Sequence, residues 1–124
     1  MKYLYKIYFY RDANGNEPIV DYLKELSAKT DKNSRLNLRK IQDYINILQQ
    51  CGKSAGEPYM KHLDGDIWEL RPLRNRIFFV AWDGSRFILL HHFIKKTQKT
   101  PKREIEQANK EYKDLTERGV KYDD

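Results

Sequence analysis

The chain has 124 residues, of which 40% are hydrophobic, 13% aromatic and 34% charged, with 24 Lys and Arg against 18 Asp and Glu. This length and composition indicate one folded domain over residues 1–124 and exclude intrinsic disorder. No apolar run approaches the roughly 18 residues of a membrane span, and no signal peptide is recognisable at the start, so we expect a cytoplasmic protein without membrane contact. The single cysteine agrees with a reducing compartment and excludes cysteine-rich zinc sites.

The net charge of +6 is concentrated in two segments. Residues 32–53 hold five basic residues and one acidic residue, and residues 67–100 hold seven basic and two acidic residues. Clustered Lys and Arg are typical of proteins that bind a polyanion such as RNA. The alternative is a solvated basic surface that only aids solubility, and composition alone does not separate the two.

The first half of the chain predicts a strand and two helices. Residues 2–10 are rich in aromatic and β-branched side chains and precede a polar turn, which indicates a strand. Apolar residues at helical spacing then predict a helix over about residues 17–29 and a second one that ends at Gly52. Asn33 or Ser34 is available as the N-cap of the second helix. A short connection between two helices predicts an antiparallel hairpin.

The second half predicts three strands in succession. Residues 53–64 contain glycine and proline and are expected to form a loop. The β-rich runs 67–71, 76–82 and 86–94 are separated by turn residues, and the Asp-Gly pair before the third run is a strong hairpin signal. Together they predict an antiparallel meander.

A last helix completes the predicted fold. Thr100 and Pro101 suit its N-cap and first position, Gly119 suits its end, and residues 118–124 are expected to form a frayed tail. The order of elements predicts an α+β protein of two layers. The helix hairpin and the C-terminal helix cover one face of a mainly antiparallel sheet of about four strands, and the other face stays partly open.

Basic residues gather at the ends of the predicted strands. In a meander the end of the first strand, the start of the second and the end of the third lie at one edge. Arg71, Arg76, Lys95 and Lys96 are therefore expected to converge there, with the guanidinium forks and ammonium groups that bind phosphate. The alternative is ordinary surface charge, with Arg71 paired to Glu69 on the same strand.

Two adjacent histidines occupy the last predicted strand. Strict alternation places His92 on the side of Leu90 and His91 on the opposite side. They cannot share one metal ion, so we predict no metal site. Either histidine can act as an acid or base near neutral pH, and Glu69 is a further candidate base.

Three strings together give the chain a recognisable identity. They are Lys61-His62-Leu63, Trp68-Glu69-Leu70-Arg71, and an F-x-K-K-T-x-x-T-P string over residues 93–101. The chain resembles the RelE/ParE toxin superfamily of toxin–antitoxin systems, within it the phage-derived HigB-like branch, from Tyr3 to about Tyr112.

The resemblance implies a ribosome-dependent mRNA endonuclease. Such a toxin cuts the codon in the ribosomal A site through attack of the RNA 2′-hydroxyl on the neighbouring phosphate, with neither metal nor cofactor. It further implies a cognate antitoxin, often with a helix-turn-helix domain, through which the toxin reaches operator DNA.

This chemistry guides the choice of site residues. Preplaced cations stabilise the negative charge of the phosphorane transition state, and one acid or base must move a proton. Our candidate catalytic residues are Arg71, Arg76 and Lys96 as cations and His92 or Glu69 as acid or base. Our candidate RNA-binding residues are Lys61, Arg74, Lys95 and Lys99, with Lys32, Arg35, Arg39 and Lys40 as a nonspecific contact.

Two other functions share this fold. A ParE-like inhibitor of DNA gyrase binds protein, and a non-catalytic member binds RNA or a partner. Many members of the superfamily rely on a tyrosine near the C-terminus, but the motif does not map onto Tyr112, on the apolar face of the last predicted helix, or Tyr122 in the tail. The basic cluster favours the ribonuclease, since the gyrase inhibitor does not need it.

Overall fold

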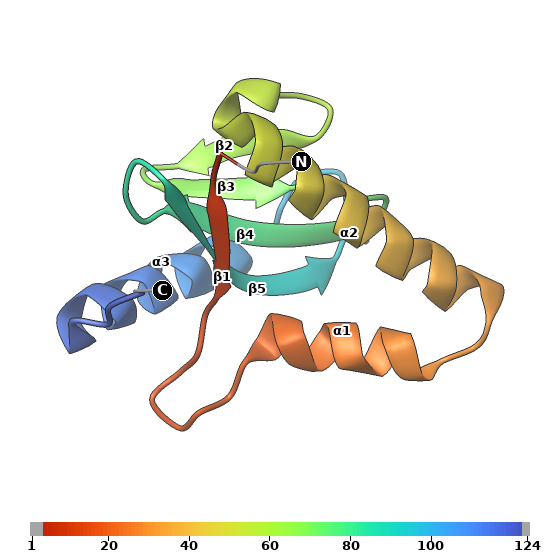
Figure 1. The fold of residues 1–124 in the computed structure, drawn as a ribbon, viewed down its shortest axis with the longest axis horizontal. Coiled ribbons are helices and arrows are strands. Elements are labelled where there is room, and N and C mark those ends of the chain that lie inside the picture. Colours follow the sequence, from red (N-terminus) through yellow and green to blue (C-terminus); the bar gives the residue numbers. More distant parts are fainter. Residues whose placement is uncertain (1–3, 123–124) are drawn as a thin grey trace.

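A computed structural model describes residues 4–122, which form three α-helices and a five-stranded mixed sheet (Figure 1). The sheet order is β1-β5-β4-β3-β2, with β1 parallel to β5 and the other neighbours antiparallel. No helix within residues 4–122 is both long and apolar enough to cross a membrane. The elements in chain order are β1 (Lys6–Phe9), α1 (Pro18–Ala28), α2 (Lys32–Cys51), the 3-10 helix η1 (Gly52–Ala55), β2 (Met60–Asp64), β3 (Ile67–Leu70), β4 (Asn75–Ala81), β5 (Arg86–Ile94) and α3 (Lys102–Arg118).

The predicted α+β class is confirmed, and the predicted count of about four strands is one too low. Residues 53–64 are not a loop throughout, because β2 pairs with β3 at the edge of the sheet. Met60 is fully buried, whereas the next two residues of β2 are exposed. Edge strands carry charged residues that discourage pairing with other chains. Because β2 is polar for this reason, the search for apolar runs did not identify it as a strand.

Helices cover both faces of the sheet, which differs from the expected arrangement of all helices on one face. The α1–α2 hairpin packs on one face, where Ile77 and Phe79 of β4 join its core. Helix α3 packs on the other face, against Phe78 and Val80 of the same strand. Both alternating sets of β4 side chains are apolar and buried, so each face requires a cover.

Irregular pairing between β4 and β5 changes which histidine faces which helix. The register shifts between Ile77 and Phe79, so that one additional β5 residue is accommodated there. His91 consequently faces α3, and His92 faces α1. The predicted alternation was therefore wrong beyond Leu90, since a bulge reverses the facing of every later side chain.

The helix ends follow specific side chains. Asp31, rather than Asn33 or Ser34, caps α2, and its carboxylate accepts hydrogen bonds from the backbone and hydroxyl of Ser34. Gly52 ends α2 as predicted, with φ of +62°, and an added Cβ would lie 2.8 Å from the Tyr5 ring. Only glycine fits there without displacing the ring.

The C-terminal end of α3 is followed by packed residues. Gly119 ends α3 in the left-handed conformation. Val120 and Tyr122 then contact the core beneath α3, and the Tyr122 ring lies 4.9 Å from that of Tyr8. The rest of the predicted tail, residues 123–124, and the predicted strand start at residues 2–3 lie outside the described residues.

Candidate functional site

The β3–β4 turn and the end of β5 meet at one edge of the sheet. Asn75 pairs with Ile94, and the backbone N–H of Lys95 donates to the carbonyl of Arg74 over 2.8 Å. This pairing brings together the segments that carry Arg71, Arg74 and Arg76 with those that carry Lys95 and Lys96. We call this region the basic edge.

Glu69 connects two of the sequence motifs, residues 68–71 and residues 93–101. The Thr100 hydroxyl donates a hydrogen bond of 2.6 Å to Glu69 Oε1, and Glu69 is only 2% exposed. The prediction that Thr100 caps α3 is therefore wrong. Pro101 occupies the N-cap position instead, without a side-chain hydrogen bond. The loop between β5 and α3 is thus held against β3.

Arg71 lies beside this carboxylate in two long ion-pair contacts. Its Nε is 3.7 Å from Glu69 Oε2, and its Nη1 is 3.9 Å from Glu57 Oε1. Both distances exceed those of good hydrogen bonds, and the side chain is 25% exposed. Lys61 of β2 pairs directly with Glu69, so this cation lies on the same face.

Arg76 is built into the turn rather than presented to solvent. It is 7% exposed, and its Nη1 donates to the carbonyls of Leu73 and Asn75, each at 2.8 Å. Burial lowers the pKa of the Arg76 guanidinium below its ordinary value, and the nearby Glu69 charge partly offsets this effect. An arginine nevertheless stays charged at neutral pH. Leu73 has φ of +59°, and the Arg76 contact helps to hold this strained backbone.

Lys96, on the β5 side of the basic edge, lines a hollow that we call the β5–α3 pocket. Its volume is about 380 Å³, and Lys96, Pro101, Arg103 and Glu104 contribute to its wall. The predicted catalytic cations therefore form two groups: Arg71 and Arg76 around Glu69, and Lys96 in this pocket.

The predicted RNA-binding residues are spread around the same edge. Arg74 lines a second pocket, of about 530 Å³, together with Tyr22 and Asn75. The Thr97 hydroxyl donates a hydrogen bond of 2.8 Å to the backbone carbonyl of Lys99, and the Lys99 side chain is exposed. The cations predicted as a nonspecific contact lie on α2, where Lys32, Arg35 and Arg39 line a pocket together with the exposed Leu36.

His92 packs against α1. Its ring stacks on Tyr22 with centroids 3.6 Å apart, and its Nε2 is buried without a hydrogen-bond partner. Burial, together with the nearby His91 charge, lowers the pKa of His92 from 6.5 to about 4. This histidine is therefore neutral near pH 7.

His91 is held between two glutamates of α3, which residue patterns did not reveal. Its Nδ1 lies 2.7 Å from Glu111 Oε1, and its Nε2 lies 3.1 Å from Glu104 Oε1. Burial lowers the pKa of His91, but the hydrogen bonds and charges of the two glutamates outweigh burial and raise it above 6.5. The available signal was two glutamates seven residues apart on the apolar face of α3, beside Ala108.

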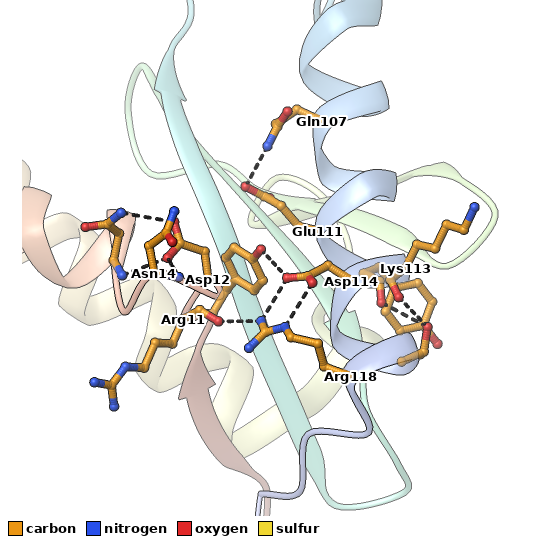
Figure 2. A network of polar contacts seen from close by, with 12 residues as sticks. Arg11, Asp12, Asn14, Gln107, Glu111, Lys113, Asp114 and Arg118 are labelled. Atoms are coloured by element: carbon orange, nitrogen blue, oxygen red, sulfur yellow. Dashed lines mark hydrogen bonds and ion pairs between the residues drawn. The ribbon is translucent and has the colours of Figure 1, made fainter.

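The opposite end of α3 carries a different polar network (Figure 2). Tyr10 donates a hydrogen bond of 2.7 Å to Asp114, which also accepts from Arg118, and Arg118 in turn donates to the Arg11 carbonyl. Tyr112 and Tyr122 pack edge-on against Trp82, just beyond the far end of β4 from the basic edge. Neither tyrosine reaches the basic edge, because the length of β4, about 20 Å, separates Trp82 from that edge.

Comparison with known proteins places these features in a family. The family described as "Phage derived protein Gp49-like (DUF891)" matches residues 21–113. The match therefore includes both groups of predicted catalytic cations and the His91 cluster. This family belongs to the toxins of toxin–antitoxin systems. No curated protein matches the chain significantly.

Proposed function

The chain belongs to the Gp49-like family of phage-derived proteins, and on this premise we propose that it is a ribosome-dependent, metal-independent mRNA endonuclease that cuts A-site codons. In this proposal residues 1–124 form a single cytoplasmic toxin domain of the HigB type. A cognate antitoxin with a helix-turn-helix domain neutralises it and carries it to operator DNA.

The basic edge is the observation that carries this proposal. It brings a buried arginine and several partly or fully exposed cations to one end of the sheet, where the Thr100–Glu69 hydrogen bond holds the loop before α3 against β3. Cleavage by the 2′-hydroxyl concentrates negative charge on the phosphorane, so cations that are already in place stabilise the transition state more than the ground state. A gyrase inhibitor of the same fold has no need for such an arrangement.

The geometry suggests a division of roles among the predicted residues. Arg71 and Lys96 are exposed enough to contact the scissile phosphate, whereas the buried Arg76 positions the turn that carries Arg74. The exposed or half-exposed cations at the same edge bind the flanking phosphates of mRNA or ribosomal RNA; they are Lys61, Arg74, Lys95 and Lys99.

Neither predicted acid–base residue has a geometry that favours proton transfer. Glu69 is enclosed and bound by Thr100 and Arg71, and His92 is neutral and stacked on Tyr22. We therefore propose that Glu69 positions Arg71 and the loop before α3, and that His92 packs α1 against β5.

A cleavage assay on ribosomes programmed with mRNA tests the proposal. We expect the wild type to cut within the A-site codon and to leave ribosome-free mRNA intact. Arg71→Ala and Lys96→Ala should each slow cleavage at least about 100-fold, as does removal of a transition-state donor in other enzymes. Lys113→Ala is the matched control, because Lys113 is exposed on α3 and pairs with Glu117 away from the basic edge.

The outcomes separate the alternatives. A wild type that leaves mRNA intact but traps gyrase on DNA contradicts the proposal in favour of the gyrase inhibitor. Full cleavage by both variants contradicts the residue roles while the enzyme class stands.

A further inference from the structure

The β5–α3 pocket contains a carboxylate that no assigned role uses. We propose that Glu104 is the proton acceptor for the RNA 2′-hydroxyl in this pocket, and that His91 and Glu111 are positioning residues that hold it. The inference rests on the proposed ribonuclease function and assigns the acid–base chemistry of the same site.

The three side chains are connected in series through the His91 ring, and their exposure increases from Glu111 to Glu104 in the pocket. Glu111 and His91 are 5% and 8% exposed, and the Glu104 side chain is 21% exposed. Both His91 nitrogens face carboxylate oxygens, and only the imidazolium form donates a hydrogen bond to both. Since the two glutamates contact opposite nitrogens of one ring, they do not converge on a common point where a metal ion would bind.

Glu111 is itself anchored. Its Oε1 contacts His91, and its Oε2 accepts a hydrogen bond of 3.3 Å from Gln107 (Figure 2). His91 also contacts the ring of Phe78 on β4, at 4.9 Å between centroids, and is followed along β5 by the neutral His92. The orientation of the imidazole is therefore fixed from α3 and from the sheet.

Glu104 is fixed through one oxygen and open at the other. His91 binds Oε1, whereas Oε2 has only a loose contact of 4.0 Å with Arg103 Nε. The residue lines the pocket, so Oε2 is the oxygen that an incoming group can reach. A carboxylate that is held in orientation but keeps a free oxygen meets the geometric requirement for a general base.

The surroundings of Glu104 suit an RNA phosphodiester. Lys96 and Arg103 line the same pocket, which also includes the start of the 17-residue helix α3. Cationic side chains and the free N–H groups of a helix N-terminus both stabilise phosphate oxygens. The pocket thus combines a base with the groups that hold its substrate.

The step balances with residues of this chain. Glu104 Oε2 takes the proton of the 2′-hydroxyl as O2′ forms a bond to phosphorus and the bond from phosphorus to O5′ breaks. The Lys96 ammonium gives a proton to the leaving O5′, and solvent then reprotonates Lys96 and deprotonates Glu104. The products are a cyclic phosphate and a 5′-hydroxyl end.

Single-turnover cleavage on programmed ribosomes, measured across pH, tests the assignment. Glu104→Gln keeps the size of the side chain and should lower the cleavage rate about 100-fold or more with ribosome binding unchanged. Glu106→Gln is the matched control, since Glu106 lies on the same helix, is exposed, and contacts only Lys102 at 4.0 Å. Its rate should equal that of the wild type.

The pH profile distinguishes positioning by His91 from a purely structural role. In the wild type the rate should fall at alkaline pH as the imidazolium loses a proton and releases Glu104. His91→Gln should be slower, and its alkaline fall should begin at a higher pH than in the wild type because only the Lys96 proton donor then titrates, whereas a structural defect would lower the rate equally at every pH.

Each result has a defined meaning. If the wild type cuts and Glu104→Gln cuts within about threefold of it, the inference is wrong and the proposed function stands. A wild type that leaves mRNA intact overturns both. Should Glu104→Gln fail to fold, Glu104→Asp carries the test, because it keeps the charge but withdraws the oxygens, and an unchanged rate in that variant would also overturn the inference.

Discussion

The two ends of α3 are both tied to the sheet side of the molecule by polar contacts, but they use their polar atoms differently. At the C-terminal end both carboxylate oxygens of Asp114 accept hydrogen bonds, from Tyr10 and Arg118, over 2.7 to 2.9 Å. At the N-terminal end Glu104, together with Glu111 from the middle of the helix, occupies both nitrogens of His91, yet Glu104 Oε2 accepts no hydrogen bond from the described residues.

This difference separates a structural network from a site that can bind a substrate. We call the network of Tyr10, Asp114 and Arg118 the clamp. A network whose atoms are all satisfied has nothing left to offer a substrate, so its contribution is to stability. A network that is rigid inside and unsatisfied at its outer end can hold a reactive group in one orientation. Variants at the two ends should therefore differ in both size and kind of effect.

The largest stability effect is expected from Glu111→Ala. This change leaves His91 buried with one partner instead of two, and removing one member of a buried charged pair costs about 2–4 kcal/mol. The free energy of unfolding from urea titration measures it. Asp114→Ala at the exposed end should cost clearly less, because water replaces the lost contacts; equal losses at both ends would contradict the distinction.

A smaller loss is expected from Thr100→Val, which preserves shape but removes the hydroxyl that donates to Glu69. An acceptor left without its partner in a buried position costs about 1–3 kcal/mol. Urea titration again provides the measurement, with Thr116→Val as the control, because the exposed Thr116 hydroxyl binds only carbonyls of its own helix. If Thr100→Val unfolds at the control's urea concentration, the tie between β3 and the loop before α3 has no energetic role.

The sequence predicted the regular elements well because their patterns are local. The predicted strand over residues 86–94 matches β5, since β-rich residues run from a hairpin signal to charged residues. Hairpin topology also predicted that Arg71 and Arg76 lie at one edge with Lys95, and a backbone hydrogen bond joins Lys95 to Arg74 in the turn between those arginines.

The arrangement around His91 was beyond these patterns for two physical reasons. The bulge that turns His91 toward α3 depends on how β4 and β5 pair, and no residue of β5 signals it. Helix α3 was also expected on the same face as the α1–α2 hairpin, whereas it covers the opposite face. Alternation along a strand assigns side chains to the correct face of the sheet only where the pairing with the neighbouring strand is regular.

A rise of pH just above 6.5 should act on α3 through His91. The pKa of folded His91 is raised above its ordinary 6.5, so its stabilising contribution is complete below about pH 6.5 and is lost as pH rises through the folded pKa. The melting temperature of His91→Gln should consequently fall less than that of the wild type as pH rises above 6.5. His62→Gln, in an exposed strand, should keep the wild-type dependence, and a His91→Gln curve parallel to the wild type would contradict the charged contact. The lowered pKa of His92 does not interfere, because it affects stability only below pH 6.5.

Tyr10→Phe should have the smallest effect and makes the sharpest test of the clamp. The change removes one hydroxyl, and the loss should be at most about 1 kcal/mol because Asp114 keeps Arg118 and gains water. Thermal unfolding measures this loss, and ribosome cleavage should proceed at the wild-type rate because the basic edge lies elsewhere. A variant that folds but cuts poorly would contradict this distinction. It would show that the position of Glu104 at one end of α3 depends on the Tyr10–Asp114 contact at the other end.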